Sequence, residues 1–246
     1  MRSIVQYHRP ADVAEVVALL SRPEVNTVVV AGGTSIPPDS QTETEVVDIQ
    51  AAVGSGLELQ DGRLVMGAMC RLQDIVDSRL TPPLIQDLAR REGPSTFRHA
   101  ATVGGTVGAA DWESGLLAGL LVYEAELTFA TTGGTRAMSL EEALAAPYVP
   151  GGAVITSVSI VVDGEATFAA TGRTPADTPI VAAAARVVSA GFRVALTGVA
   201  ATPVLVDPND LASLDPPGDF RGSSRYRKAL ASTLVGRAIA RLGGAA

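Results

Sequence analysis

Two glycine-rich segments are the strongest chemical signals in this chain of 246 residues. The first, AGGTSIPPD at 31–39, follows a short β-branched run, and the second, RHAATVGGTVG, spans 98–108. Glycine tolerates positive φ, so successive backbone N–H groups in such a segment can converge on an anion, with threonine and serine hydroxyls beside them. Either segment alone is also compatible with a tight turn or with close packing of small residues. Together they suggest a ligand with two phosphates.

Several other chemistries are disfavoured. Neither segment fits G-x-G-x-x-G or G-x-x-x-x-G-K-[ST], which argues against a Rossmann dinucleotide site and a Walker loop. Cys70 is the only cysteine, so this chain alone cannot supply a thiolate cluster. His8 and His99 are the only histidines and lack partners at metal-ligand spacing. We expect no metal site and no catalytic residue, with His99 a hydrogen-bonding loop residue.

The composition is that of an acidic, folded protein. Hydrophobic residues make up 47% of the chain and charged residues 18%, which predicts a buried core. The net charge of −7 and the pI near 4.9 argue against a nucleic-acid or anionic-membrane surface. No apolar run has the length of a membrane span, and the first residues do not resemble a signal peptide. These features predict a cytoplasmic location.

The elements around the first segment follow from local patterns. Asp12 and Glu15 form a predicted capping box ahead of an amphipathic helix over 13–20. Strands are predicted at 27–31, which should be buried, and at 45–49. The next elements are a strand at 63–67, a helix carrying Leu72, Ile75, Val76 and Leu80, and a further helix that begins at Pro82-Pro83.

The rest of the chain alternates strands and helices. The patterns predict a buried helix at 116–122, a hairpin of 126–131 with 136–138, and a short helix capped by Ser139 and Glu142 that ends at Pro147. Further strands are predicted at 154–162, 186–188 and 193–198, then a loop-rich stretch at 203–219 and a last helix capped by Ser223 or Ser224. The stretch 147–152 is the best domain boundary.

The order of these motifs carries a family resemblance. AGGTSIPPD (31–39) followed by FRHAATVGGTVGAAD (97–111) resembles the FAD-binding subunits of molybdenum hydroxylases. That group includes the medium subunit of aerobic carbon monoxide dehydrogenase and the flavin domain of xanthine dehydrogenase. Three more segments extend the resemblance over essentially the whole chain, and the last is the most specific: VQYHRPADVAEVVALL (5–20), GLLVYEAEL (119–127) and DFRGSSRYRKALASTLVGRAIARL (219–242).

The resemblance implies an α+β fold. A PCMH-type FAD-binding domain would cover 1–148 as two α/β subdomains, about 1–52 and 53–148, and a smaller α+β domain with an antiparallel sheet would cover 149–246. The first segment would bind the FAD pyrophosphate, and the second would contact the phosphates and the ribityl chain. The implied FAD-contacting residues are Ala31, Gly32, Gly33, Thr34, Ser35, Ile36, Thr102, Gly104, Gly105, Thr106, Asp111 and Glu113.

The resemblance also implies partners. A molybdopterin-containing large subunit would oxidise the substrate, a [2Fe-2S] small subunit would relay the electrons, and FAD on this chain would pass them to an acceptor. The single cysteine agrees with a cluster held elsewhere. Asp219, Arg221, Tyr226 and Arg227 are expected to anchor the last helix, and Trp112 is expected to pack internally.

Two alternatives remain at this point. A flavin-free scaffold is suggested by Thr106 where the family usually has Asn, Gly115 where an Asp is expected, and Thr178 where a tyrosine often shields the flavin. A stand-alone flavin oxidoreductase of the wider fold is the third interpretation. The absence of a histidine or cysteine suited to covalent flavin attachment and the short C-terminal domain count against it.

Overall fold

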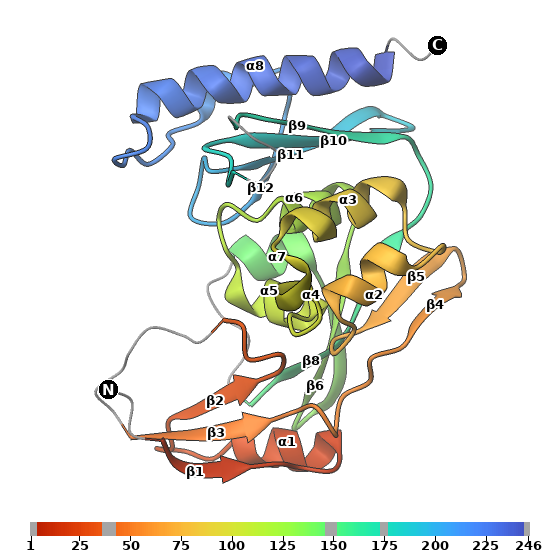
Figure 1. Cartoon of the computed structure of the whole chain (residues 1–246), viewed down its shortest axis with the longest axis vertical. Helices are drawn as coiled ribbons and strands as arrows, with labels where there is room; N and C mark the ends of the chain where they lie inside the picture. Colours follow the sequence, from red (N-terminus) through yellow and green to blue (C-terminus); the bar gives the residue numbers. More distant parts are fainter. Residues whose placement is uncertain (1–3, 36–42, 146–151, 173–176, 244–246) are drawn as a thin grey trace.

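The computed structural model describes residues 4–35, 43–145, 152–172 and 177–243. Three β-sheets follow one another along the longest axis of the molecule, with most of the helices between the second and third sheets (Figure 1). A single long helix lies across the outer side of the third sheet. This arrangement confirms the α+β class. No helix in the described part of the chain is both long and apolar enough to cross a membrane.

The N-terminal unit is a three-stranded parallel sheet with one helix. Its elements are β1 (Ile4–His8), α1 (Val13–Leu20), β2 (Thr27–Val30) and β3 (Thr44–Asp48), and the strand order is β1-β3-β2. The side chain of Asp12 caps α1 by accepting from Glu15 N at 2.9 Å, as predicted. The prediction of a buried strand at 27–31 is wrong, because β2 is an edge strand and Val29 is 39% exposed. The central strand β3 is the buried one.

The second sheet is antiparallel and has the strand order β4-β5-β8-β6-β7. Its strands are β4 (Leu57–Gln60), β5 (Arg63–Gly67), β6 (Glu126–Thr131), β7 (Gly134–Ser139) and β8 (Val154–Val161). Because β8 pairs with both β5 and β6, the sheet includes residues beyond the expected boundary at 148. That boundary lies outside the described residues, and the pairing leads us to propose a division after Val161 instead.

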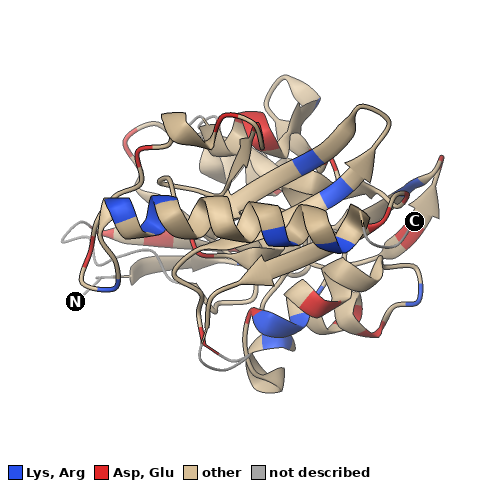
Figure 2. Cartoon of the chain, turned by 90° about the horizontal axis from the view of Figure 1, so that it is seen from above, with Lys and Arg blue, Asp and Glu red and all other residues tan. Residues whose placement is uncertain are grey.

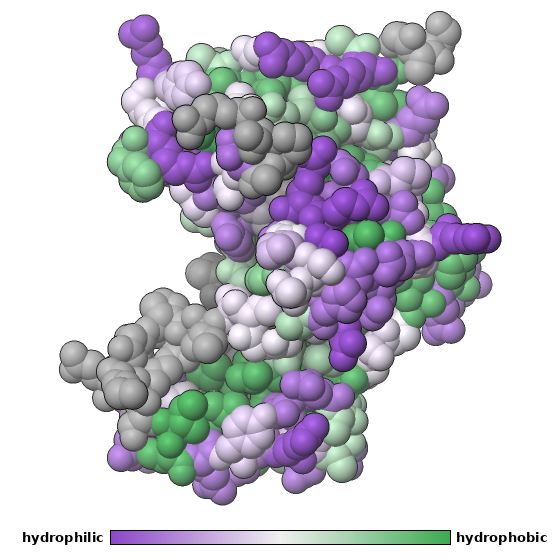
Figure 3. Space-filling view, viewed as in Figure 1, coloured by the Kyte–Doolittle hydropathy of each residue, from purple (hydrophilic) through white to green (hydrophobic). Residues whose placement is uncertain are grey.

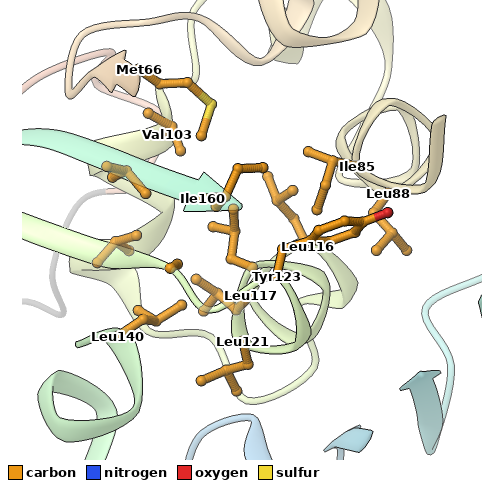
Figure 4. Close-up of a cluster of buried hydrophobic side chains, with 14 of the residues drawn as sticks. Met66, Ile85, Leu88, Val103, Leu116, Leu117, Leu121, Tyr123, Leu140 and Ile160 are labelled. Atoms are coloured by element: carbon orange, nitrogen blue, oxygen red, sulfur yellow. The ribbon is translucent and has the colours of Figure 1, made fainter. Parts of the chain in front are cut away.

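Six short helices pack against one another between the second and third sheets (Figure 1). They are α2 (Leu72–Asp77), α3 (Pro83–Arg91), α4 (Ser95–Arg98), α5 (Val103–Ala109), α6 (Gly115–Val122) and α7 (Leu140–Ala145). In α6 every residue after the first is buried, which suits a helix that is apolar on all sides. Figure 4 shows Leu116 and Leu117 pointing among side chains of α3 and β8. Leu80 is 47% exposed and lies beyond the end of α2, contrary to the prediction.

The third sheet is antiparallel, in the order β12-β11-β10-β9. Its elements are β9 (Ala166–Ala170), β10 (Ala182–Val188), β11 (Gly191–Thr197), β12 (Val204–Val206), the 3-10 turn η1 (Leu211–Ser213) and α8 (Ser224–Gly243). The alanine run 182–185 is a strand, although alanine favours helices. It is buried on both faces between α8 and α6, where small side chains allow both helices to approach the sheet closely.

Candidate functional site

The first glycine-rich segment follows the end of β2. Glycine is required at its two glycine positions on different grounds, a close contact at Gly32 and a backbone conformation at Gly33. A Cβ added to Gly32 would lie 1.8 Å from the backbone oxygen of Ala100, so Gly32 allows the two glycine-rich segments to touch. Gly33 has φ +69°, a conformation that L side chains rarely adopt, and faces open space. This segment therefore combines close packing at Gly32 with an open, left-handed turn at Gly33. Ile36 lies outside the described residues.

The second glycine-rich segment is not a continuous loop, because its first residue, Arg98, ends α4 and its second half belongs to a helix. Residues 103–109 form α5, and the Thr102 hydroxyl caps it by accepting from Gly105 N at 3.0 Å. A Cβ on Gly104 would lie 2.7 Å from the Cβ of Ala68, so this glycine serves close packing. The Thr106 hydroxyl donates to Thr102 O at 3.1 Å, within its own helix.

A cavity of about 600 Å³ lies between these segments and the open face of the first sheet. Figure 3 shows apolar side chains on the N-terminal unit, below the rest of the molecule. The cavity is lined by eight of the predicted residues: Ala31, Gly32, Gly33, Thr34, Ser35, Thr102, Gly104 and Gly105. Tyr7, Val28, Val46, Gly108 and others complete the lining. Thr106 is not among the lining residues. No described residue that lines it is charged, so an anion here would rely on backbone N–H groups and hydroxyls.

A second cavity, of about 350 Å³, contains two more of the predicted residues. Asp111 and Glu113 line it, with residues of α3 and β9 and with the 177–179 segment opposite. Gly108 and Ala109 at the end of α5 line the larger cavity, only two residues before Asp111. Ala110 turns the chain between them in the left-handed conformation, with φ 47°. Ten of the twelve predicted residues thus line two cavities at the two ends of one short turn, and Thr106 lines neither.

The smaller cavity is tied to the C-terminal segment by an arginine. Arg221 pairs with Glu113 and also donates to the backbone oxygen of Thr178 on the facing wall. Burial raises the pKa of Glu113, and the nearby Arg221 opposes that rise. The Glu113 carboxylate, which was expected to contact the ligand, is therefore already engaged by a cation.

The expected internal packing of Trp112 is confirmed. Its ring lies 4.7 Å from the guanidinium carbon of Arg227, a cation–π arrangement. Arg227 is fully buried and donates to the backbone oxygens of Ile180 and Gly198, at 2.7 and 3.0 Å, and to Asp219 at 2.7 Å. This bond holds the pKa of Asp219 below its ordinary value, so the stability that Asp219 contributes is lost only when the pH falls through that lowered pKa. Asp219 and Arg227 thus anchor α8, as expected, whereas Arg221 binds the wall of the smaller cavity and Tyr226 is 47% exposed.

Glu92 is a residue of the smaller cavity that the sequence did not reveal. It follows α3, and its carboxylate accepts from the Ser114 hydroxyl at 2.8 Å and from Leu116 N at 2.9 Å. Burial raises the pKa of Glu92 above its ordinary value. No local pattern could have identified it, because its partners are 22 and 24 residues away. Among the described residues, no group of three or more His, Cys, Asp or Glu could hold a metal ion.

We expect Glu92→Gln to become more stable relative to the wild type as the pH rises. A folded state that raises the pKa of a carboxyl binds its proton more tightly than the unfolded chain does, so ionisation destabilises the fold. That loss begins near the ordinary value of 4.5 and is complete above the raised pKa. Glutamine keeps an oxygen that can accept from Leu116 N. Urea unfolding of both proteins from pH 4 to pH 8 would measure the difference, and a constant difference would contradict it.

Comparisons with a family model and with known proteins support the resemblance that the sequence shows. The model of the family described as "FAD binding domain in molybdopterin dehydrogenase" matches residues 3–160. A protein of Escherichia coli strain K12 named YgfM is 28% identical over an alignment of 250 residues that covers 94% of each chain.

Solved structures of low sequence identity share the fold over the whole length. A carbon monoxide dehydrogenase chain from Hydrogenophaga pseudoflava has a TM-score of 0.88 at 21% identity, covering 99% of both chains. A carbon monoxide dehydrogenase chain from Oligotropha carboxidovorans has a TM-score of 0.85 at 23% identity, covering 100% of both. Quinoline 2-oxidoreductase from Pseudomonas putida 86 gives 0.82 at 20% identity, covering 100% of this chain and 98% of that one.

Proposed function

Because the chain belongs to the family of FAD-binding domains in molybdopterin dehydrogenases, we propose that it receives electrons from a [2Fe-2S] partner and passes them through FAD to an acceptor. The observation that carries this proposal is the cavity of about 600 Å³ between the two glycine-rich segments. Bound FAD would supply the redox chemistry. The chain's own part is to bind the cofactor, to orient it and to present it to its partners.

The larger cavity fits the pyrophosphate and the nucleoside end of FAD. Gly33, in its left-handed conformation, and the hydroxyls of Thr34 and Ser35 border the cavity on one side, and Gly105 borders it on the other. Phosphate oxygens accept hydrogen bonds from backbone N–H groups, so no lysine or arginine is required. The apolar face of the first sheet suits the flat, weakly polar rings of a nucleoside.

We propose that the flavin end of the cofactor lies toward the smaller cavity. The turn at Ala110 places the two cavities next to each other along the chain, which suits a ligand with two ends. Asp111 and Glu113 would face the ribityl hydroxyls there, while the Arg221 contact holds Glu113 in position. Gly115 leaves room at the N-terminus of α6, where a side chain would meet Leu88 and Phe168.

The proposed partners are a molybdopterin-containing large subunit and a [2Fe-2S] small subunit, in a complex that we place in the cytoplasm. The single cysteine supports a cluster on another chain, since Cys70 is buried and its pKa is raised to about 12. Two of the structures that share this fold are named as carbon monoxide dehydrogenases, and the name of one says that it lacks the Mo-pyranopterin moiety of the molybdenum cofactor. The family to which this chain belongs is itself defined by molybdopterin dehydrogenases.

An absorption spectrum of the purified chain, followed by titration with FAD, tests this proposal. A flavin spectrum or saturable binding would support it. A folded chain that stays without flavin, alone and with its partners, would favour the flavin-free scaffold. That alternative draws on two observations: the Thr106 hydroxyl is bonded within its own helix, and Arg221 already occupies the Thr178 oxygen. Turnover of a substrate by the isolated chain would instead favour a stand-alone oxidoreductase.

Gly108→Leu is expected to weaken FAD binding about tenfold or more without loss of stability. No atom lies within 4 Å of a Cβ built on Gly108, and the residue borders the larger cavity, so leucine would occupy ligand space. Leucine also favours the helix more than glycine does. Gly236→Leu is the matched control, since Gly236 is a helical glycine with open space on α8. Equal FAD affinity of both variants in a fluorescence titration would contradict the assignment of this cavity.

A further inference from the structure

Phe220 is the most exposed large hydrophobic residue of the described chain, with 98% of its surface open to solvent. It lies in the turn that leads into α8. From this turn we infer a docking surface, made of Phe220, Arg225 and Tyr226, for the [2Fe-2S] partner that passes electrons to the flavin. The partner would offer an apolar pocket for the phenyl ring, with carboxylates around it. This inference rests on the proposed function.

The turn is held firmly, so the exposure of Phe220 is a built feature. One oxygen of Asp219 accepts from the backbone N–H groups of Arg221 and Gly222, both at 2.9 Å. The other oxygen accepts from the buried Arg227. The half-exposed ring of Tyr226 packs beside Gly222, where a Cβ would lie 3.1 Å from it. The fully exposed ring of Phe220 on this turn and the half-exposed ring of Tyr226 in the first turn of α8, next to Arg225, have the composition of a binding hot spot.

The charge on α8 indicates what kind of surface would bind there. The chain as a whole is acidic, with 26 Asp and Glu against 19 Lys and Arg. α8 has the opposite character: it contains five basic residues and no acidic one, and its blue segments stand out in Figure 2. Arg225 and Arg237 are exposed on it. A basic helix on an acidic protein favours a partner with an acidic surface.

The position of the turn connects this surface with the cofactor site. Arg221, the residue after Phe220, reaches into the wall of the smaller cavity through Glu113 and the Thr178 oxygen. A partner that covers Phe220 would therefore lie at the rim of the cavity where we place the flavin. That is where a redox partner has to be, because electron transfer requires the two redox groups to be close together.

A second copy of the chain is a poorer occupant of this surface. An isologous contact through α8 would bring two basic, acid-free helices together, and like charges would repel. A membrane is also disfavoured, because only one aromatic side chain protrudes and the chain carries a net charge of −7. The surface chemistry thus points to a different polypeptide with acidic residues.

The test uses the full chain, tagged and expressed in its source organism, with Phe220→Ala and Arg225→Glu as variants. Iron, molybdenum and FAD per purified chain are measured together. We expect both metals to accompany the wild type and to fall about tenfold or more in each variant, while FAD is retained. Leu59→Ala and Arg136→Glu, which change an exposed hydrophobic residue and an exposed arginine on β4 and β7, should keep the metals.

The outcomes separate the two proposals. Metals on the wild type and undiminished metals on both variants would overturn the docking surface and leave the proposed function standing. A wild type without iron and molybdenum would overturn both. Cosedimentation with vesicles of phosphatidylglycerol and phosphatidylethanolamine that Phe220→Ala abolishes, or dimerisation that it abolishes, would also overturn docking of a redox partner.

Discussion

Replacing Gly32 with alanine is expected to weaken FAD binding by about ten- to a hundred-fold and to destabilise the fold by about 1–3 kcal/mol. The added Cβ would lie 1.8 Å from the backbone oxygen of Ala100, and a carbonyl oxygen cannot move aside as a flexible side chain can. The two glycine-rich segments would have to separate, and both line the larger cavity. FAD titration and urea unfolding measure the two effects.

A matched control for this variant is Gly54→Ala. Gly54 lies outside the cavity, and no atom lies within 4 Å of a Cβ built there. The control should bind FAD as the wild type does, with a stability change of no more than about 1 kcal/mol. Wild-type affinity and stability in Gly32→Ala would show that the two segments do not touch as described. Lost stability with unchanged affinity would separate the contact from the cofactor site.

Arg227→Met is expected to lower the free energy of unfolding by about 2–5 kcal/mol, because each buried acceptor that loses its donor costs about 1–3 kcal/mol. The side chain is fully inaccessible and supplies hydrogen bonds to Ile180, Gly198 and Asp219. Methionine fills much of the volume but leaves these acceptors without a donor. Urea unfolding followed by the emission of Trp112, the only tryptophan, reports directly on the stacked pair.

Two further variants delimit this prediction. Arg225→Met removes an exposed arginine from the same helix and should change stability by less than about 0.5 kcal/mol. Arg227→Lys should be nearly as damaging as Arg227→Met, because an ammonium cannot reproduce the planar stack on Trp112 together with its branched set of hydrogen bonds. If Arg227→Met unfolds at the same urea concentration as Arg225→Met, the Arg227 cluster does not anchor α8.

Local patterns predicted the elements whose signals are short-range. The Asp12 cap of α1, the Ser139 and Glu142 cap of α7 and the hairpin of β6 with β7 all depend on residues a few positions apart. Strands with weak or misleading local signals were missed, namely β1, β4, β9, β12 and the alanine run at the start of β10. Strand pairing and burial between helices decided these elements, and both depend on residues far away in the sequence.

The sequence by itself determined the family, the two glycine-rich segments and the amphipathic α8, because order, spacing and period are properties of the chain. Only the tertiary structure decided what each glycine does: Gly32 and Gly104 allow close packing, whereas Gly33 and Gly108 face open space. It also placed Asp111 and Glu113 in a separate cavity, brought Glu92 to α6 and stacked Arg227 on Trp112. The physical reason is that a cavity or a buried charge pair is made by groups from distant segments, and only folding brings those groups together.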